Sequence, residues 1–379
     1  MNAGEDLSPL LAPFRLGGLE MRNRIVCSPI SINLADGRGH VSDLVVQFYA
    51  MMGKTGVGMV TIGASSVSPE GGSTNTGTHV GKPEFEPGLR RLADAVRETG
   101  ALSSLQIFHV GAQGNTAYSG QPVLGPSAYV CPDIGIMAHP LEPEDIARIE
   151  DEFVDAVISG LNCSFDFVEL HLAHGYLLHQ FLSPYFNHRT DRYGGSPGNR
   201  LRIMEAIAEK LARREPAALR RIGCRISGND FLPDGMTIES NRPVVDLLEA
   251  LGCAYWVVSA GIYDTAKQKP IHMARGDYWR YAGELRRFAR APVVAQGGIR
   301  SLETGARILR DGQGDLIGLA QALIADPLII EKSAAGRSSE VVPCLECGRC
   351  RYLKRKDLTF DCVRPEGAGG VRPEGGGSG

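Results

Sequence analysis

The chain has 379 residues, of which 43% are hydrophobic and 22% charged, and this composition indicates a globular protein rather than a disordered or fibrous one. Its 40 basic and 43 acidic side chains give a formal net charge of −3, which argues against a basic surface for nucleic acid or for an anionic membrane. We therefore expect neither a nucleic acid nor a membrane as a partner.

The N-terminal segment has no basic start followed by an apolar run, which is the pattern of a secretory signal. No later segment approaches the roughly 18 uninterrupted apolar residues that a membrane-spanning helix needs. The chain has nine cysteines, and four of them lie between Cys344 and Cys362. An odd number of cysteines, clustered in this way, does not indicate a disulfide framework. We therefore expect a cytoplasmic protein.

Short runs rich in Val, Ile and Leu alternate along the chain with longer amphipathic segments. This alternation is expected of parallel strands that are buried on both faces and joined by crossover helices. The expected strands are 24–29, 58–63, 102–108, 166–170, 222–227, 254–259, 292–296 and 315–319. The expected helices are 42–55, 87–99, 142–160, 198–213, 241–251, 278–290, 301–310 and 322–335.

Eight strand–helix units predict an α/β fold, a (β/α)₈ TIM barrel, over residues 1–335. An open doubly wound sheet is the alternative, but it would usually place a Gly-x-Gly-x-x-Gly turn after its first strand, and none is present there. A short cysteine-rich extension follows over 336–363. The glycine-rich tail 364–379 repeats Arg-Pro-Glu-Gly and is expected to be disordered.

One stretch, HLAHGYLLHQFLSPYFNHRTDRYGG at 171–195, is dense in histidine, tyrosine and glycine and has neither helical nor strand periodicity. It begins where the fourth expected strand ends. Polar residues or glycines also stand near the ends of most of the other expected strands. Since the carboxyl ends of barrel strands meet on one face, these residues together predict a site there.

Five stretches of the chain resemble the Old Yellow Enzyme family of FMN-dependent ene-reductases, in particular its branch with 2,4-dienoyl-CoA reductase and trimethylamine dehydrogenase. The long central stretch at 171–202 is the most specific match. The resemblance implies an enzyme that is reduced by NAD(P)H and transfers hydride from reduced flavin to an α,β-unsaturated carbonyl or dienoyl substrate. The other matching stretches are NRIVCSPIS at 23–31, LQIFHVG at 105–111, CRIS at 224–227 and VVAQGGI at 293–299.

The resemblance also implies which residues bind FMN over the barrel domain, 1–335. Gln106 pairs with the pyrimidine edge of the flavin, and Arg225 stabilises negative charge near N1 and O2 of the reduced ring. The family usually has Gly-Arg where this chain has Ala320 and Gln321, so weaker FMN binding is expected unless Arg300 substitutes. The remaining implied contacts are Pro29, Ile30, Ser31 and Ala64 along the ring and Gly297 and Gly298 at the phosphate.

Three residues of the central stretch match the catalytic positions of the family. The resemblance implies that His171 and His174 donate hydrogen bonds to a substrate carbonyl and that Tyr176 donates a proton to the α-carbon. A phenol is protonated at neutral pH and suits this role. The alternative is a metal site that includes both histidines, but their i, i+3 spacing differs from the i, i+4 pair of helical zinc sites.

The extension at 336–363 carries four cysteines, Cys344, Cys347, Cys350 and Cys362. Their spacing is similar to the [4Fe–4S] motif of the same branch. Zinc also accepts four cysteines, and a motif without metal is the third alternative, because the chain lacks the large C-terminal FAD or NAD(P)H domain of its long relatives. With a cluster, an external electron donor could reduce FMN; without one, NAD(P)H would.

Other functions stay open at this stage. Within the family, the alternative is an amine dehydrogenase or demethylase. A barrel that binds flavin without turnover is the alternative from another class. An aldolase-like barrel is a third, but no lysine stands clearly at a strand end to form a Schiff base. The sequence does not fix the substrate or the oligomeric state, and a homo-oligomer remains among the alternatives.

Overall fold

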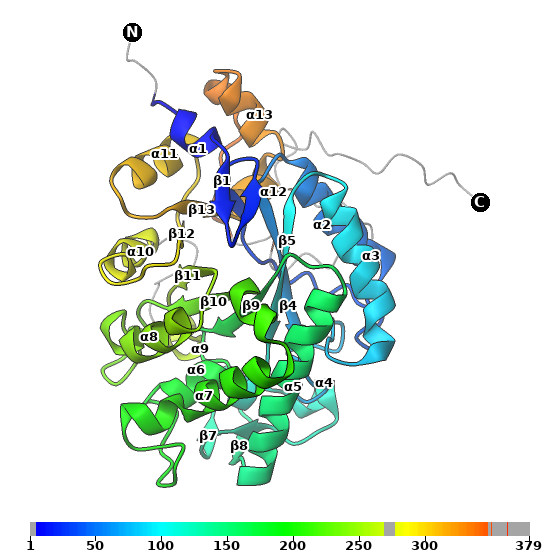
Figure 1. The fold of residues 1–379 in the computed structure, drawn as a ribbon, viewed down its shortest axis with the longest axis vertical. Helices are drawn as coiled ribbons and strands as arrows, with labels where there is room; N and C mark the ends of the chain where they lie inside the picture. The colour runs from blue at the N-terminus through cyan, green and yellow to red at the C-terminus, as the bar shows by residue number, and fades with distance from the viewer. Residues whose placement is uncertain (1–4, 269–276, 348–349, 351–361, 363–379) are drawn as a thin grey trace, which may run out of the picture.

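The computed structural model describes residues 5–268, 277–347, 350 and 362. Eight parallel strands form a closed barrel in the order β10-β11-β12-β13-β3-β4-β5-β9, which confirms the predicted (β/α)₈ fold (Figure 1). The order follows the chain around the barrel, as successive right-handed β–α units require. The strands are β3 Ile25–Cys27, β4 Met59–Ser66, β5 Leu102–Phe108, β9 Phe167–Leu172, β10 Ile222–Ser227, β11 Tyr255–Ser259, β12 Val293–Gln296 and β13 Leu316–Leu319.

Helices surround the barrel, with α2 and α3 on one side and α8 and α10 on the other (Figure 1). Their apolar faces pack on the outer face of the strands in one large core cluster. The longer helices are α2 Asp43–Lys54, α3 Glu86–Arg97, α5 Pro143–Asn162, α7 Pro197–Arg214, α8 Arg242–Ala250, α10 Trp279–Leu285 and α11 Leu302–Arg310. The shorter ones are α1 Ser8–Leu11, α4 Thr116–Ser119, α6 Leu177–Leu182, α9 Tyr263–Gln268, α12 Gln321–Ala325 and α13 Ile329–Ala334.

The prediction of a single last helix over 322–335 is wrong. Two short helices, α12 and α13, are separated at Asp326 and Pro327. A proline disfavours helical geometry at the residue before it, and Asp326 is extended, with φ −143° and ψ 97°. The Asp326 carboxylate then accepts hydrogen bonds from the backbone N–H groups of Leu328 and Val342, which stabilise the break.

A hairpin that was not predicted closes the amino-terminal end of the barrel. Its strands are β1 Phe14–Leu16 and β2 Leu19–Met21, joined by Gly17 and Gly18 with positive φ angles of 52° and 87°. Two consecutive glycines of this geometry suit a two-residue hairpin turn. The hairpin packs into the barrel interior against a second core cluster that includes Val26, Met59, Phe167, Tyr255, Val257, Val294 and Leu316. The opposite end is therefore the one left for a site.

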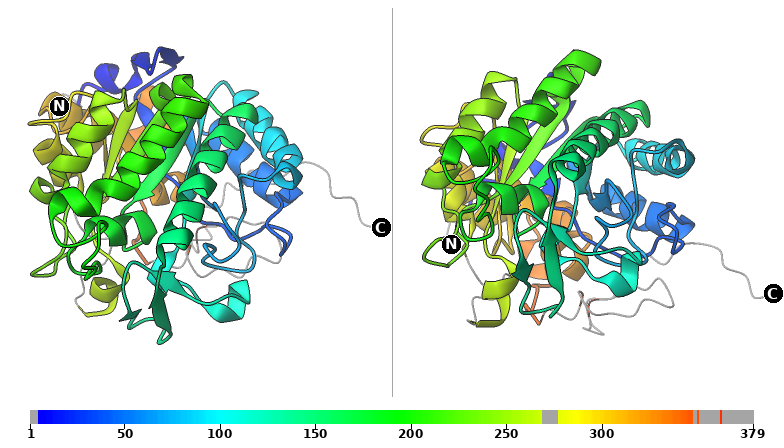
Figure 2. Two further views of the ribbon diagram at one scale, coloured as in Figure 1. Left: turned by 60° about the horizontal axis from the view of Figure 1, so that its bottom comes forward. Right: turned by 90° about the horizontal axis from the view of Figure 1, so that it is seen from below.

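A small sheet stands at that opposite, carboxyl-terminal end. It lies between β5 and α5 in the chain and consists of β6 Leu124–Gly125, β7 Tyr129–Val130 and β8 Met137–Pro140. In Figure 1 it appears at the lower end of the molecule, away from the hairpin, and Figure 2 shows it from further sides. None of the described helices is both long and apolar enough to span a bilayer.

An ion-pair network ties the loop after β4 to helix α5. Arg148 lies 2.6 Å from the carboxylate of Glu70 and 2.8 Å from that of Glu152. Burial raises the pKa of Glu152 to about 7, although Arg148 acts in the opposite direction. The folded state therefore disfavours the ionised form of Glu152, whose pKa in the unfolded chain is about 4.3.

This network predicts a pH-dependent stability. A carboxyl whose pKa is raised in the folded state contributes stability that is lost as the pH rises from about 4.3 to about 7. Glu152→Gln removes the ionisation, so the variant should lose less thermal stability than the parent protein between about pH 4 and about pH 8. Thermal unfolding across this range measures the difference. Glu144→Gln on the exposed face of the same helix is the control, and equal slopes for all three proteins would contradict the prediction.

Candidate active site

The carboxyl ends of the barrel strands surround a cavity of about 510 Å³. Strands from every part of the barrel contribute to its wall, as closure of the barrel requires. The structure brings together all the residues that the sequence predicted for catalysis and flavin binding. They are Pro29, Ile30, Ser31, Ala64, Gln106, His171, His174, Tyr176, Arg225, Gly297, Gly298, Ala320 and Gln321.

The two histidines form a hydrogen-bonded chain on one wall of the cavity. His171 Nδ1 accepts a hydrogen bond from the backbone N–H of Ala173 at 3.2 Å, so its proton is on Nε2. His171 Nε2 lies 3.1 Å from His174 Nδ1, and His174 Nε2 lies 2.7 Å from Ser259 Oγ. Burial, followed by the charges of His174 and Arg225, places the pKa of His171 well below its usual value. The chain of contacts therefore assigns both rings as neutral Nε2–H tautomers.

A strained turn directly after β9, the strand that carries His171, presents His174. His174 and Gly175 have positive φ angles of 62° and 75°, which are uncommon for a residue with a side chain. A Cβ atom at Gly175 would lie 2.2 Å from Gln113 Nε2, so this side chain would have to move, and the φ of 75° would strain any residue other than glycine. The backbone N–H of Gly175 donates to His179 Nδ1 at 2.7 Å, and His179 Nε2 lies 3.1 Å from the buried carboxylate of Asp230. His179, which the sequence suggested only as a further ligand in the alternative metal site, instead holds the turn through Gly175.

Tyr176 follows this turn directly and lines the cavity. Its ring packs against those of His171 and Phe108, with centroids 4.8 and 5.0 Å away. The hydroxyl lies 3.2 Å from that of Tyr263. Burial raises the pKa of Tyr176, so the phenol is protonated at neutral pH. The group can therefore act as an acid.

A buried polar network lies inside the barrel beneath the cavity. Glu169 is fully buried and accepts hydrogen bonds from Gln106 Nε2 at 2.6 Å and Tyr255 Oη at 3.2 Å. The positive charge of Arg225 acts on this carboxylate, although burial still raises the pKa of Glu169. Arg225 also donates to Ser259 Oγ at 3.2 Å. Since the predicted amide and guanidinium both contact other side chains, their orientations are set before any ligand binds.

The far end of the cavity is built from glycines and one arginine. Gly297 and Gly298, which follow β12, have φ angles of 90° and 72°. This left-handed geometry, without side chains, lets two backbone N–H groups approach a ligand closely. Arg300 also lines the cavity and forms an ion pair with Glu346. Gln321, at the position where the family usually has arginine, lies 3.9 Å from the sulfur of Cys350.

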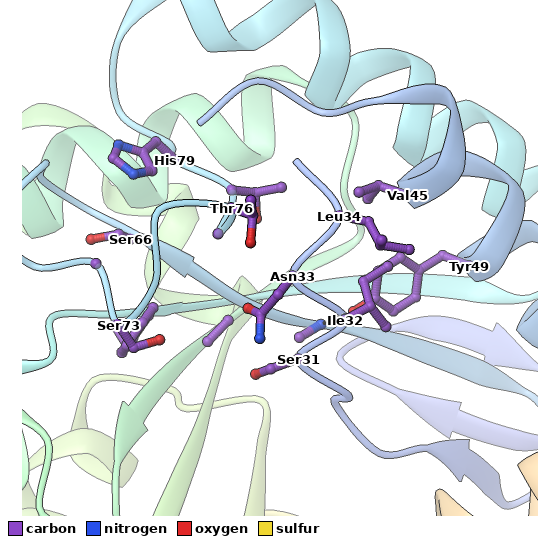
Figure 3. A pocket seen from close by; sticks show the side chains of 16 residues that line it. Ser31, Ile32, Asn33, Leu34, Val45, Tyr49, Ser66, Ser73, Thr76 and His79 are labelled. Carbon is purple, nitrogen blue, oxygen red and sulfur yellow. Dashed lines mark hydrogen bonds between the residues drawn. The ribbon is translucent and has the colours of Figure 1, made fainter. Parts of the chain in front are cut away.

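A polar recess of about 20 Å³ adjoins the cavity between the loops after β3 and β4. Figure 3 shows Ser31 and Asn33 on the first loop and Ser73 on the second. Thr74 Oγ1 donates to Asn33 Oδ1 at 3.1 Å and joins the two loops. The volume is about that which one buried water needs. The recess therefore extends the polar wall without enlarging the space for a substrate.

Two of the four clustered cysteines, Cys344 and Cys350, line the same cavity. Burial, followed by the negative charges of the other three thiolates, raises the pKa of Cys344 to about 11. In the part of the chain that the structure describes, no group of three or more His, Cys, Asp or Glu side chains is arranged to hold a metal ion. The predicted cluster therefore receives no support from the geometry. Most of the extension and the tail at 364–379 lie outside the described residues.

Several residues of the site were missed by the sequence analysis. Glu169 is a polar residue inside an otherwise apolar strand, and this feature could have signalled an inward-facing role. Gln296 is the last residue of β12 and carried the strand-end signal of the predicted residues. Ser259 is the last residue of its strand and carried the same strand-end signal as the predicted residues. Tyr263 and Tyr278 carried no such signal, because Tyr263 begins α9 and Tyr278 directly precedes α10, away from the strand ends.

The comparisons with known proteins agree with this geometry. An NADH oxidase of Thermoanaerobacter brockii is 33% identical over 348 residues, which cover 89% of this chain and 52% of that protein. A metal reductase of Desulforamulus reducens is 32% identical, and the match covers 90% of this chain and 51% of the reductase. The chain thus spans about half the length of these two relatives. An NADPH dehydrogenase of Bacillus subtilis (strain 168), 27% identical, is matched over 96% of its length and 88% of this chain.

Solved structures share the fold. A histamine dehydrogenase from Rhizobium sp. 4-9 matches with a TM-score of 0.77 at 26% identity, over 90% of this chain and 50% of that one. A complex of 2-naphthoyl-CoA reductase matches with a TM-score of 0.83 at 24% identity, over 90% of this chain and 54% of the reductase. An old yellow enzyme homologue from Zymomonas mobilis matches with a TM-score of 0.77 at 22% identity, over 94% of this chain and 98% of the homologue. The last two show the fold alone.

The sequence model of one family covers nearly the whole barrel. It is described as the NADH:flavin oxidoreductase / NADH oxidase family and matches residues 9–340. The match confirms the resemblance that the sequence analysis drew from the motifs. With the closed barrel and the converging site, it establishes that this chain belongs to the NADH:flavin oxidoreductase / NADH oxidase family.

Proposed function

We propose that this protein is an FMN-dependent, NAD(P)H-linked oxidoreductase of the ene-reductase type. Its substrate would be an α,β-unsaturated carbonyl compound or a dienoyl compound. One observation carries the proposal: a neutral histidine pair and a protonated tyrosine face one cavity together with an arginine and a glutamine. Those are the groups that carbonyl polarisation, proton donation and flavin binding each need.

The cavity residues fit FMN. Arg225 Nε is buried and has no hydrogen-bond partner among the described residues, although the residue lines the cavity. A buried guanidinium N–H needs an acceptor, and an electron-rich ring edge would supply one. Gln106 would pair with the same ring, and Gly297 and Gly298 would hold the phosphate with backbone N–H groups. Pro29, Ile30, Ser31 and Ala64 would line the ring, and Ala320 and Gln321 would complete the phosphate end.

The chemistry divides between the cofactor and the chain. When bound, FMN supplies the hydride that is added to the β-carbon of the substrate. His171 and His174 would polarise the substrate carbonyl by turning their Nε2–H groups from His174 Nδ1 and Ser259 Oγ to the carbonyl oxygen. Tyr176 Oη holds a proton beside them and would deliver it to the α-carbon. Strand β9 and the strained turn after it keep these three side chains on one wall of the cavity.

Visible spectroscopy of the purified protein tests the proposal. We expect a yellow protein with FMN that is bleached by NADH or NADPH and recovers its colour when an enone is added. A protein that stays colourless after FMN is added would contradict any flavin function. Bleaching without reoxidation by any enone or quinone would favour a flavin-binding barrel without turnover. Histamine and trimethylamine test the amine dehydrogenase alternative, since a histamine dehydrogenase shares the fold.

The four cysteines carry a separate proposal, that Cys344, Cys347, Cys350 and Cys362 bind a [4Fe–4S] cluster. Their spacing supports it, and the described geometry does not, so no step above depends on a cluster or on an external electron donor. Analysis of iron and acid-labile sulfide after anaerobic purification tests it. Four iron atoms per chain are expected with a cluster, and zinc or no metal would contradict it.

A prediction concerns the cation at the phosphate end. Arg300 is the candidate to replace the arginine that the family usually has at Gln321. The Arg300 side chain is 46% exposed and already forms an ion pair with Glu346, and both features weaken its attraction for a phosphate. Arg300→Ala should therefore weaken FMN binding by only about five- to tenfold. Quenching of FMN fluorescence measures the Kd. Arg307→Ala, an exposed arginine outside the cavity, is the control, and the prediction is wrong if Arg300→Ala leaves the Kd unchanged.

A further inference from the structure

A second tyrosine lies beside the proposed proton donor. The hydroxyl oxygens of Tyr176 and Tyr263 are 3.2 Å apart, and their ring centroids are 6.0 Å apart. Both side chains line the cavity. The two residues are 87 positions apart in the chain, and no motif connects them. The contact is therefore a product of the fold.

The backbone on which Tyr263 stands is held firmly. Tyr263 is the first residue of α9, and the next residue, Asp264, is only 2% exposed. The Asp264 carboxylate accepts a hydrogen bond from Tyr185 at 2.7 Å and another from Tyr129. These two phenols come from the loop after α6 and from β7, so three separate segments meet at one carboxylate. A hydroxyl carried by such an anchored turn has a defined position rather than that of a mobile surface group.

The electrostatics give the two phenols different roles. Burial raises the pKa of Tyr176, whereas the hydrogen bond with Tyr263 and the charge of Arg225 lower it. The pKa of Tyr263 lies well above its usual value, first because of the charge on Tyr176 and then because of burial. Tyr176 is therefore the phenol that gives up its proton first, and Tyr263 keeps its proton and donates a hydrogen bond.

We propose that Tyr263 is a positioning residue that stabilises the phenolate of Tyr176 after proton transfer. The inference rests on the proposed ene-reductase function. In the step, hydride from the reduced flavin adds to the β-carbon and leaves an electron pair at the α-carbon. The Oη–H bond of Tyr176 breaks and a C–H bond forms with that pair. The negative charge moves to Tyr176 Oη, where the Tyr263 hydroxyl donates to it, and water then returns a proton to Tyr176.

The Tyr263→Phe variant removes only the hydroxyl and tests the proposal in anaerobic stopped-flow experiments. Reduction of the flavin by NAD(P)H should be unchanged, and reoxidation by an enone should slow about ten- to a hundredfold. Reoxidation by ferricyanide, which needs no proton, should be unchanged. The alkaline limb of the enone rate should move upward by about one pH unit, because the pKa of Tyr176 rises without the hydrogen bond. If Tyr263→Phe is reoxidised by the enone at the rate of the parent protein and the alkaline limb of its pH–rate profile does not shift, the proposal is overturned.

A second measurement separates this inference from the proposed function. Labelling with 3-fluorotyrosine gives a ¹⁹F resonance for Tyr176, which is assigned because it is absent in Tyr176→Phe. The pH titration of this resonance needs no substrate. Its midpoint should move to higher pH in Tyr263→Phe and stay in place in the control Tyr281→Phe, which lies outside the cavity. Failure of every enone to reoxidise the parent protein would overturn the ene-reductase function alone. An unmoved midpoint would overturn the role of Tyr263, whatever the substrate is.

Discussion

Replacing Tyr176 with phenylalanine should slow reoxidation by an enone about 10²- to 10⁴-fold while reduction of the flavin by NAD(P)H continues at its normal rate. The reason is that the phenol is needed only in the second half of the cycle, when the α-carbon must receive a proton. The Tyr176 ring packs against His171 and Phe108, and phenylalanine preserves these contacts. Separate stopped-flow measurements of the two half-reactions check the prediction.

The control for this experiment is an acceptor that takes electrons without a proton at carbon. Ferricyanide should reoxidise Tyr176→Phe as fast as the parent protein. Equal losses in both half-reactions would mean that Tyr176 supports flavin binding or the fold, and the assigned role would be wrong. A His174→Ala variant should instead weaken enone binding and turnover together, because the His174 imidazole would polarise the carbonyl both before and during hydride transfer.

Replacing Arg225 with methionine should lower the free energy of unfolding of the FMN-free protein by about 3 kcal/mol at pH 8. The change removes the positive charge that acts on the fully buried Glu169. The hydrogen bonds from Gln106 and Tyr255 to Glu169 remain. The loss of stability should therefore lie at the lower end of the range expected when one of two opposite buried charges is removed. Urea unfolding measures it.

The pH dependence of this loss has a definite sign. The pKa of Glu169 is already raised by burial, and removing the guanidinium raises it further. A carboxyl with a raised pKa in the folded state stabilises the protein below its unfolded pKa and loses this contribution as the pH rises. The variant should therefore be less impaired at about pH 5 than at about pH 8. The double variant Arg225→Met with Glu169→Gln should regain most of the stability, and a double variant as unstable as the single one would contradict the pairing.

The sequence predicted the architecture well because barrel strands carry a local signal. Each strand is a short apolar run that is buried on both faces, and each helix has an apolar stripe. Both patterns can be recognised in the segment itself, without information about the segments that pack against it. All eight barrel strands appear near their predicted positions. The hairpin that closes the barrel was missed, because strands of three residues are too short to show a period. The break before α13 was signalled by Pro327, but the apolar pattern continued across it.

The predicted site residues also come together, since each lies in the carboxyl-terminal half of a strand or in the segment just after it, and barrel closure collects these segments on one face. Their chemical roles remain predictions that the experiments above test. The sequence could not reveal the partners of these residues. Ser259 beside His174 and Tyr263 beside Tyr176 are contacts between distant segments, and the charge of Arg225 acts on Glu169 of another strand.

The sequence by itself thus determined which segments become strands and which residues stand at their ends, because burial periodicity and strand-end chemistry are local properties of the chain. Only the tertiary structure decided which histidine nitrogens carry protons, which carboxylate faces the arginine and which phenol supports the proton donor. These depend on the register of neighbouring strands, such as Arg225 opposite His171, and on the loops that close over the barrel. Register and loop packing are set by the whole fold, since no short stretch of sequence contains both partners of such a contact.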